Sequence, residues 1–120
     1  MEEKTFLVFE NETGQVEVRD ETVTRVAALA ALGVEGVDSL GSGITADTVA
    51  TTGLKKLASG VEMIENDGLV DIYIAMVVNV GTIIPDACRA VQEKVRSEIE
   101  DMLGVVVGHV NIRVASIKVE

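Results

Sequence analysis

The segment from Val61 to Val80 constrains the fold more than any other part of the chain, because it encodes a β-hairpin. Two runs rich in apolar residues, Val61 to Ile64 and Leu69 to Val80, flank Asn66-Asp67-Gly68. An Asp-Gly pair tolerates the positive φ angles of a tight hairpin turn. Ile72 to Val78 is apolar at both odd and even positions, so we expect this strand to be central and covered on both faces, or else to lie under an oligomer contact.

Two amphipathic segments predict helices. The first runs from about Glu21 to Leu32, with Asp20 as its N-cap and Gly33 as a left-handed stop. Its buried stripe is formed by residues at helical spacing: Val23, Val26, Ala27 and Ala30.

The second predicted helix is longer. Pro85 suits its first turn, and it runs to about Met102, with Gly104 as its C-cap. The predicted buried stripe is Cys88, Val91, Val95, Ile99 and Met102. The polar residues of the other face are Asp86, Arg89, Gln92, Glu93, Arg96, Glu100 and Asp101. We expect that face to be exposed to solvent; a docking face for a charged partner is the alternative.

The remaining segments complete a sheet. A first hairpin is predicted over Thr5 to Phe9 and Gln15 to Val18, and a short strand over Val37 to Leu40. The Gly-, Ser- and Thr-rich stretch from Gly41 to Gly60 predicts a mobile loop with about one helical turn at most. The last strand, within Val105 to Val119, should run parallel to the Leu69 to Val80 strand, because strand–helix–strand connections in one sheet are almost always right-handed crossovers.

These elements predict one two-layer α/β (α+β) domain covering residues 1–120, in the order β-β-α-β-β-β-α-β. We expect a mixed sheet of about five to six strands with two helices. The two halves share the order hairpin, helix, strand, which suggests an internal duplication as a testable hypothesis.

Composition argues against several classes of partner. The formal charge is −10, and the only aromatic residues are Phe6, Phe9 and Tyr73, so binding to nucleic acid or to an anionic membrane is disfavoured. Cys88 is the only cysteine, which excludes an internal disulfide and fits a reducing cytoplasm. The acidic start of the chain is unlike a secretory signal, and no stretch approaches the roughly 20 apolar residues of a membrane span.

Residues that carry out chemistry are few. His109 is the only histidine, and we expect it to have a structural role at a strand edge. Cys88 lies on the predicted buried stripe and is expected to act as a small hydrophobe. The acids around the second hairpin, Glu62, Glu65, Asp67 and Asp71, lack the pattern of a calcium loop. We therefore predict no catalytic residue, no metal site and no cofactor.

One anion site remains a minority hypothesis. Lys55 and Lys56, which follow Gly53, and the earlier Gly41-Ser42-Gly43 could offer cations and backbone N–H groups. Neither stretch matches a phosphate-loop pattern, so a plain flexible loop is the favoured interpretation.

Taken in order, several motifs resemble one bacterial family. They are Gly14-Gln15-Val16-Glu17-Val18, Val34-Glu35-Gly36-Val37, Val70-Asp71-Ile72-Tyr73-Ile74, Val80-Gly81-Thr82-Ile83-Ile84-Pro85, Val91-Gln92-Glu93-Lys94-Val95 and Val110-Asn111-Ile112. Their order and spacing resemble the alkaline-shock-protein family, also called the Gls-type general or envelope stress response family. The chain departs from that pattern at Val80, where many members have Tyr, and at Leu103, where many have Thr before the Gly. If those side chains contact a partner, that contact is in doubt here.

The resemblance implies a non-enzymatic protein of Gram-positive-type bacteria, abundant under envelope or alkaline stress. It also implies self-association and attachment to the membrane through a separate anchor protein. The alternative is a small anionic-ligand-binding or enzyme-accessory domain linked to lipid metabolism, using Lys55 and Lys56.

Overall fold

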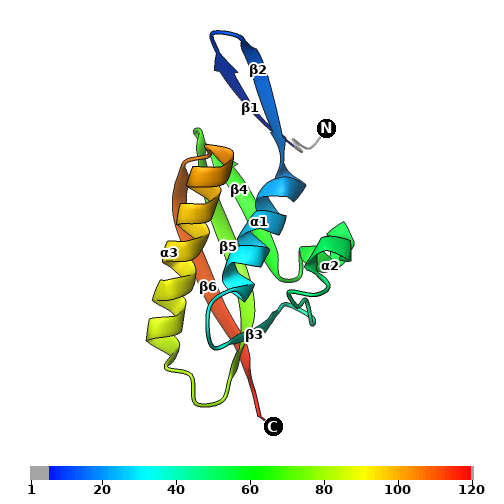
Figure 1. The fold of residues 1–120 in the computed structure, drawn as a ribbon, viewed down its shortest axis with the longest axis vertical. Coiled ribbons are helices and arrows are strands. Elements are labelled where there is room, and N and C mark those ends of the chain that lie inside the picture. Colours follow the sequence, from blue (N-terminus) through cyan, green and yellow to red (C-terminus); the bar gives the residue numbers. More distant parts are fainter. Residues whose placement is uncertain (1–5, 120) are drawn as a thin grey trace.

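The computed structural model describes residues 6–119, and its elements follow the predicted order (Figure 1). They are β1 Phe6–Asn11, β2 Gly14–Arg19, α1 Asp20–Leu32, β3 Val37–Leu40, the 3-10 helix η1 Val49–Thr51, α2 Leu54–Leu57, β4 Val61–Asn66, β5 Leu69–Asn79, α3 Ile84–Leu103 and β6 Val107–Lys118. Thr5, the first residue of the first predicted strand, lies outside the described residues. The α+β class and the mixed sheet are confirmed.

Strand β5 is the centre of a four-stranded sheet. The parallel strand β6 pairs with it from Val70 to Asn79, as the crossover rule predicts. Its other side is shared by two shorter antiparallel strands, β4 along Leu69 to Ile74 and β3 along Met76 to Val78. The turn between β4 and β5 is the predicted one, with positive φ at both Asp67 and Gly68.

The first hairpin stands apart from this sheet. Strands β1 and β2 pair only with each other and project beyond the helices and the main sheet (Figure 1). β2 pairs with no strand of the main sheet, whereas the second hairpin supplies its central strand. The two halves of the chain therefore share an order of elements but not a pairing pattern, and the duplication stays a hypothesis.

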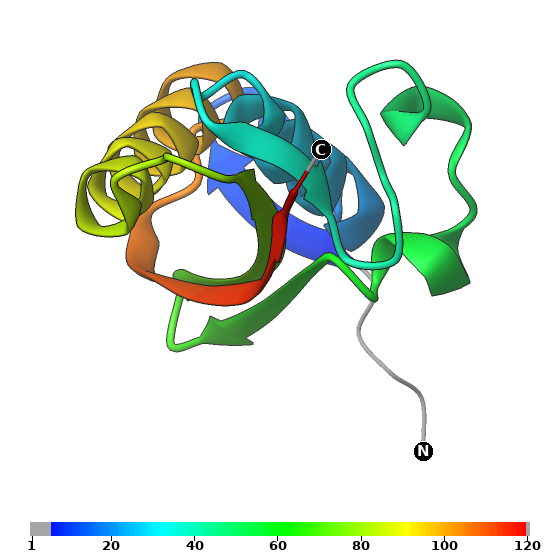
Figure 2. The same cartoon turned by 90° about the horizontal axis from the view of Figure 1, so that it is seen from below.

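Helices α1 and α3 lie together on one face of the four-stranded sheet (Figure 2). The alternating side chains of β5 that point toward them are all buried: Val70, Ile72, Ile74, Met76 and Val78. The helices contribute Val23, Ala27, Ala28, Ala30, Ala31, Val91, Val95 and Ile99 to the same core. Both predicted stripes are confirmed except at Met102, which is 63% exposed; Leu103, the last residue of α3, packs against the core instead.

The ends of the helices test the capping predictions. Pro85 lies in the first turn of α3, and Gly104 closes it in the left-handed conformation with φ +71°, as predicted. The prediction for α1 is wrong at both ends. Arg19 occupies the N-cap, while Asp20 lies in the first turn, where its charge favours the helix dipole. Gly33 stays in the right-handed region, and the positive φ falls at Gly36.

The segment from Gly41 to Gly60 contains the expected helical turn, α2, but it is more ordered in its contacts than the prediction of a loop implies. It contains η1 and α2, and it buries Ile44, Val49 and Leu57 in the common core. Both of its ends bind one residue of β5: the Gly41 N–H donates to the Ala75 carbonyl at 2.8 Å, and the Ala75 N–H donates to the Gly60 carbonyl at 2.9 Å. A Cβ at Gly41 would lie 2.6 Å from the Ser59 carbonyl carbon, so this closure requires glycine.

Candidate interaction surfaces

The residues that sequence analysis considered for chemistry do not converge. Cys88 packs against the core, and burial raises the pKa of its thiol above the ordinary value. The side chain of His109 is 80% exposed, with Nδ1 at 3.4 Å from Asp71 Oδ1. Within residues 6–119, no group of three or more His, Cys, Asp or Glu side chains is arranged to hold a metal ion.

The proposed anion site has no enclosure. Lys55 and Lys56 are both exposed on the single turn of α2. Ser42 and Ser59 join the two ends of the segment, with their hydroxyl oxygens 3.0 Å apart. Neither lysine lines the hollows over the sheet, at the start of α3 or along its polar face, and the anion site stays an untested prediction.

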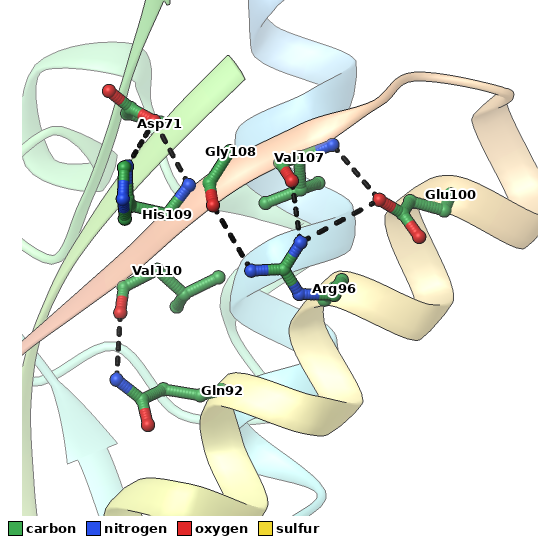
Figure 3. A network of polar contacts seen from close by, with 8 residues as sticks. All are labelled: Asp71, Gln92, Arg96, Glu100, Val107, Gly108, His109 and Val110. Atoms are coloured by element: carbon green, nitrogen blue, oxygen red, sulfur yellow. Dashed lines mark hydrogen bonds and ion pairs between the residues drawn. The ribbon is translucent and has the colours of Figure 1, made fainter. Parts of the chain in front are cut away.

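The polar face of α3 is exposed, as predicted, but some of its side chains also bind the start of β6. Arg96 donates from Nη1 to the Val107 carbonyl at 2.6 Å and from Nη2 to the Gly108 carbonyl at 3.1 Å. Glu100 Oε2 accepts from the Val107 N–H at 3.1 Å, 3.9 Å from the Arg96 guanidinium (Figure 3). These side chains satisfy the backbone groups at the start of β6 that no strand pairs.

A third side chain of the same stripe extends this arrangement. Gln92 donates to the Val110 carbonyl at 2.9 Å (Figure 3). The sequence signal is therefore the spacing of Gln92, Arg96 and Glu100, four residues apart beside the apolar stripe. The edge that they cover is a tertiary feature, so this role could not be predicted from the helix alone.

A bulge in β6 contributes to the same region. The pairing of β5 with β6 skips Gly108, and a Cβ there would lie 2.7 Å from Asp71 Oδ1. The Asp71 carboxylate instead accepts the His109 N–H at 3.0 Å. This contact uses the backbone N–H, and the structural role of the histidine itself stays a prediction.

The second face of the four-stranded sheet carries no helix (Figure 2). We call it the open sheet face. The side chains that the strand registers assign to it include Glu62, Ile64, Leu69, Asp71, Tyr73, Ala75, Val77, His109, Asn111 and Arg113. Ile64 is 53% exposed, Leu69 44% and Tyr73 42%. β5 is central, as predicted; no helix of residues 6–119 covers its second face, and coverage there by an oligomer contact stays a prediction.

A hollow of about 900 Å³ lies over the middle of the open sheet face. Gly60 and Ala75, which are neighbours across the sheet, have little or no side chain to fill this space. Tyr73, Glu62 and Arg113 line the same hollow. The residues at the centre of the hollow are thus small and apolar, and charged side chains lie at its sides.

A second surface lies where the motif residues meet, and we call it the loop end: Val34 to Gly36 after α1 and Val80 to Ile83 before α3. The Asn79 N–H donates to the Gly36 carbonyl at 2.8 Å, which holds the two loops together. Gly36 has φ +96°, and a Cβ there would lie 2.8 Å from the Thr82 methyl carbon. The two loops line a hollow of about 600 Å³, beside which Val80 is 59% and Ile83 66% exposed.

A family model matches residues 8–119, which include both surfaces. The chain belongs to the alkaline shock protein 23 family. That family is described as having a cell envelope-related function, and the resemblance drawn from the sequence motifs is thereby confirmed. A relative in Bacillus subtilis (strain 168), the uncharacterized protein YqhY, is 29% identical over 107 residues, which are 88% of this chain and 78% of that protein.

No solved structure matches the chain. Of the helices within residues 6–119, none combines the length and the apolar character that crossing a bilayer requires.

Proposed function

We propose that this chain is a non-enzymatic assembly module of the cell envelope, which associates with itself and docks from the cytoplasm to a membrane-anchored partner. Family membership supports the envelope role. The observation that carries the assembly role is the open sheet face, where the central strand presents Leu69 and Tyr73 to solvent. These exposed apolar side chains of a central strand, which lie on either side of Asp71, favour a surface that another protein covers.

The loop end is the second surface that we assign, and its occupant is the membrane-anchored partner. Val80 and Ile83 are the exposed apolar side chains there, next to the Glu35 and Asp86 carboxylates. Direct attachment to anionic lipid is disfavoured by the formal charge of −10. A protein partner with an apolar contact and basic side chains suits this surface.

Self-association is tested by size-exclusion chromatography with light scattering, at micromolar to hundred-micromolar protein and over a range of salt concentrations. We expect the molar mass to rise with concentration above that of the 12.7 kDa monomer. A constant monomer mass over the whole range would refute the assembly role and leave docking to be judged separately.

Docking is tested by co-sedimentation with membranes of Bacillus subtilis. We expect the purified chain to sediment with intact membranes, and to remain in the supernatant with protease-stripped membranes or protein-free lipid vesicles. The variant Ile83→Glu should lose most of the binding, while Ile117→Glu, also at a surface residue 49% exposed, should retain it. Equal binding to protein-free vesicles would refute a protein anchor.

A further inference from the structure

The open sheet face is divided by charge around an apolar centre. On β4, at one side, it carries Glu62; on β6, at the other side, it carries His109 and Arg113. Tyr73 on β5 lies between Glu62 and Asn111, and Ala75, next on the same face, lies beside Arg113. Asp71, the one carboxylate of β5 on this face, is bound to the backbone N–H of His109. Beside Tyr73 and Ala75 the face therefore has an acidic side on β4, a middle without charge on β5 and a basic side at Arg113.

Arg113 differs from the arginines of the helices. Arg25 pairs with Glu21 at 3.0 Å and Arg89 with Asp86 at 2.7 Å, whereas Arg113 has no ion pair among residues 6–119. Glu62 has none within the same range either. The strand β5 separates them by two strand spacings, about 10 Å, so they do not reach one another easily within one chain.

We propose that the open sheet face binds the same face of a second copy of this chain, with β4 of each copy over β6 of the other. This inference rests on the self-association proposed above and specifies its surface. A two-fold axis parallel to β5, lying between the two sheets, produces this arrangement and stacks them as in aligned sheet packing, about 10 Å apart. The acidic side of each copy then faces the basic side of its partner.

The strand registers determine which residues of the two copies face one another across this interface. Ala75 pairs with Gly60 on one side and with Arg113 on the other, so Arg113 of each copy lies over the partner's Gly60. Because Gly60 has no side chain, there is room at this position for the guanidinium of Arg113 from the other copy. Glu62 is the next residue of β4 on that face, within reach of the long arginine side chain, and the two Tyr73 rings meet near the axis.

The area predicts the strength of this dimer. Three strands, of which the central one has 11 residues, present roughly 500 Å² per copy at ordinary strand spacing and rise. The total is near the lower end of specific interfaces, so a reversible dimer with micromolar affinity is expected. The reciprocal charge pairs then supply specificity for this arrangement.

Charge reversal tests the arrangement through sedimentation velocity of the full chain at about 1–300 μM. We expect Arg113→Glu and Glu62→Arg each to weaken the homodimer at least about tenfold, because each variant places like charges opposite one another twice. An equimolar mixture of the two variants should recover affinity to within about threefold of the unmodified chain. In that heterodimer one copy carries Glu at both positions and the other Arg at both, so both pairs form.

The double variant Glu62→Arg with Arg113→Glu should recover homodimerisation for the same reason. Arg89→Glu is the matched control, since it makes the same charge change on α3, which covers the opposite face of the sheet. Its dimer affinity should remain within about threefold of the unmodified chain. Thermal unfolding of every variant verifies that it is folded.

Three results would overturn the inference. If the unmodified chain dimerises and neither single variant weakens the dimer, self-association uses another surface and only this inference fails. If the single variants weaken the dimer but neither the mixture nor the double variant recovers, the pairing of Glu62 with Arg113 is wrong. If the unmodified chain is monomeric at all concentrations, the proposed assembly role fails as well.

Discussion

Arg96 provides a direct test of how the edge of β6 is stabilised. Its guanidinium makes two hydrogen bonds, to the carbonyls of Val107 and Gly108 at 2.6 and 3.1 Å, and Val107 is only 2% exposed. We therefore predict that Arg96→Met, which keeps the apolar part of the side chain, lowers the free energy of unfolding.

The magnitude follows from the number of bonds and their exposure. Hydrogen bonds to a charged group contribute about 1.5–3 kcal/mol each when buried. The Arg96 side chain is 45% exposed, so water can replace much of what is lost. We expect a loss of about 1.5 kcal/mol, equivalent to a fall of about 6 °C in Tm for a domain of this size.

The assay is equilibrium unfolding in urea, followed by far-ultraviolet circular dichroism, with thermal scans on the same samples. Arg89→Met is the matched control, because Arg89 lies on the same helix, is exposed, and pairs only with Asp86. It should cost about 0.5 kcal/mol or less. Arg96→Lys should retain roughly half of the effect, since a lysine places one point charge where the guanidinium spans two carbonyls. Equal free energies of unfolding for Arg96→Met and Arg89→Met would refute the edge-stabilising role.

Three further predictions concern stability and reactivity. Gly41→Ala should lower the free energy of unfolding, measured in urea, by about 3 kcal/mol, and Gly43→Ala should lower it by about 1–2 kcal/mol. Both glycines have positive φ, but only at Gly41 does backbone lie within 3 Å of the new Cβ. Ile99→Ala should lose about 3 kcal/mol and Met102→Ala under about 0.5, a contrast that depends on the burial of the first and the exposure of the second. Burial raises the pKa of the Cys88 thiol, so less thiolate forms at any given pH. The reaction of Cys88 with a disulfide reagent should therefore be slower than that of free cysteine at pH 8 and should accelerate as pH rises. A rate equal to that of free cysteine would contradict this prediction.

The parts of the fold that were predictable are those with local causes. The turn at Asp67 and Gly68 depends on two residues that tolerate positive φ. The end of α3 depends on one such residue, Gly104. The parallel course of β6 follows from handedness alone. By contrast, the Gly41 to Gly60 segment has the composition of a loop, and its anchoring depends on distant contacts, above all those of Ala75.

The open sheet face shows why a surface is harder to predict than an element. Strand β5 is apolar on both faces, which correctly indicated a central strand but could not say what covers its second face. The side chains that border the hollow come from β4, β5 and β6, and Glu62 and Arg113 are about 50 positions apart in the sequence. Only the strand registers show that they lie on opposite sides of β5 on one face, Glu62 beside Tyr73 and Arg113 beside Ala75.

The same registers are also the reason why we assign the charge pattern to the proposed dimer rather than to the monomer. A side chain on the open sheet face can reach its cross-strand neighbour, but Glu62 and Arg113 have the whole width of β5 between them. Placed in one chain they leave a carboxylate and a guanidinium exposed beside an apolar hollow, which adds little to the stability of that chain. Placed opposite each other across a two-fold axis they form two pairs at once. A chain with a formal charge of −10 repels its copies at long range, and local pairs of this kind offset that repulsion at the one face where contact is proposed.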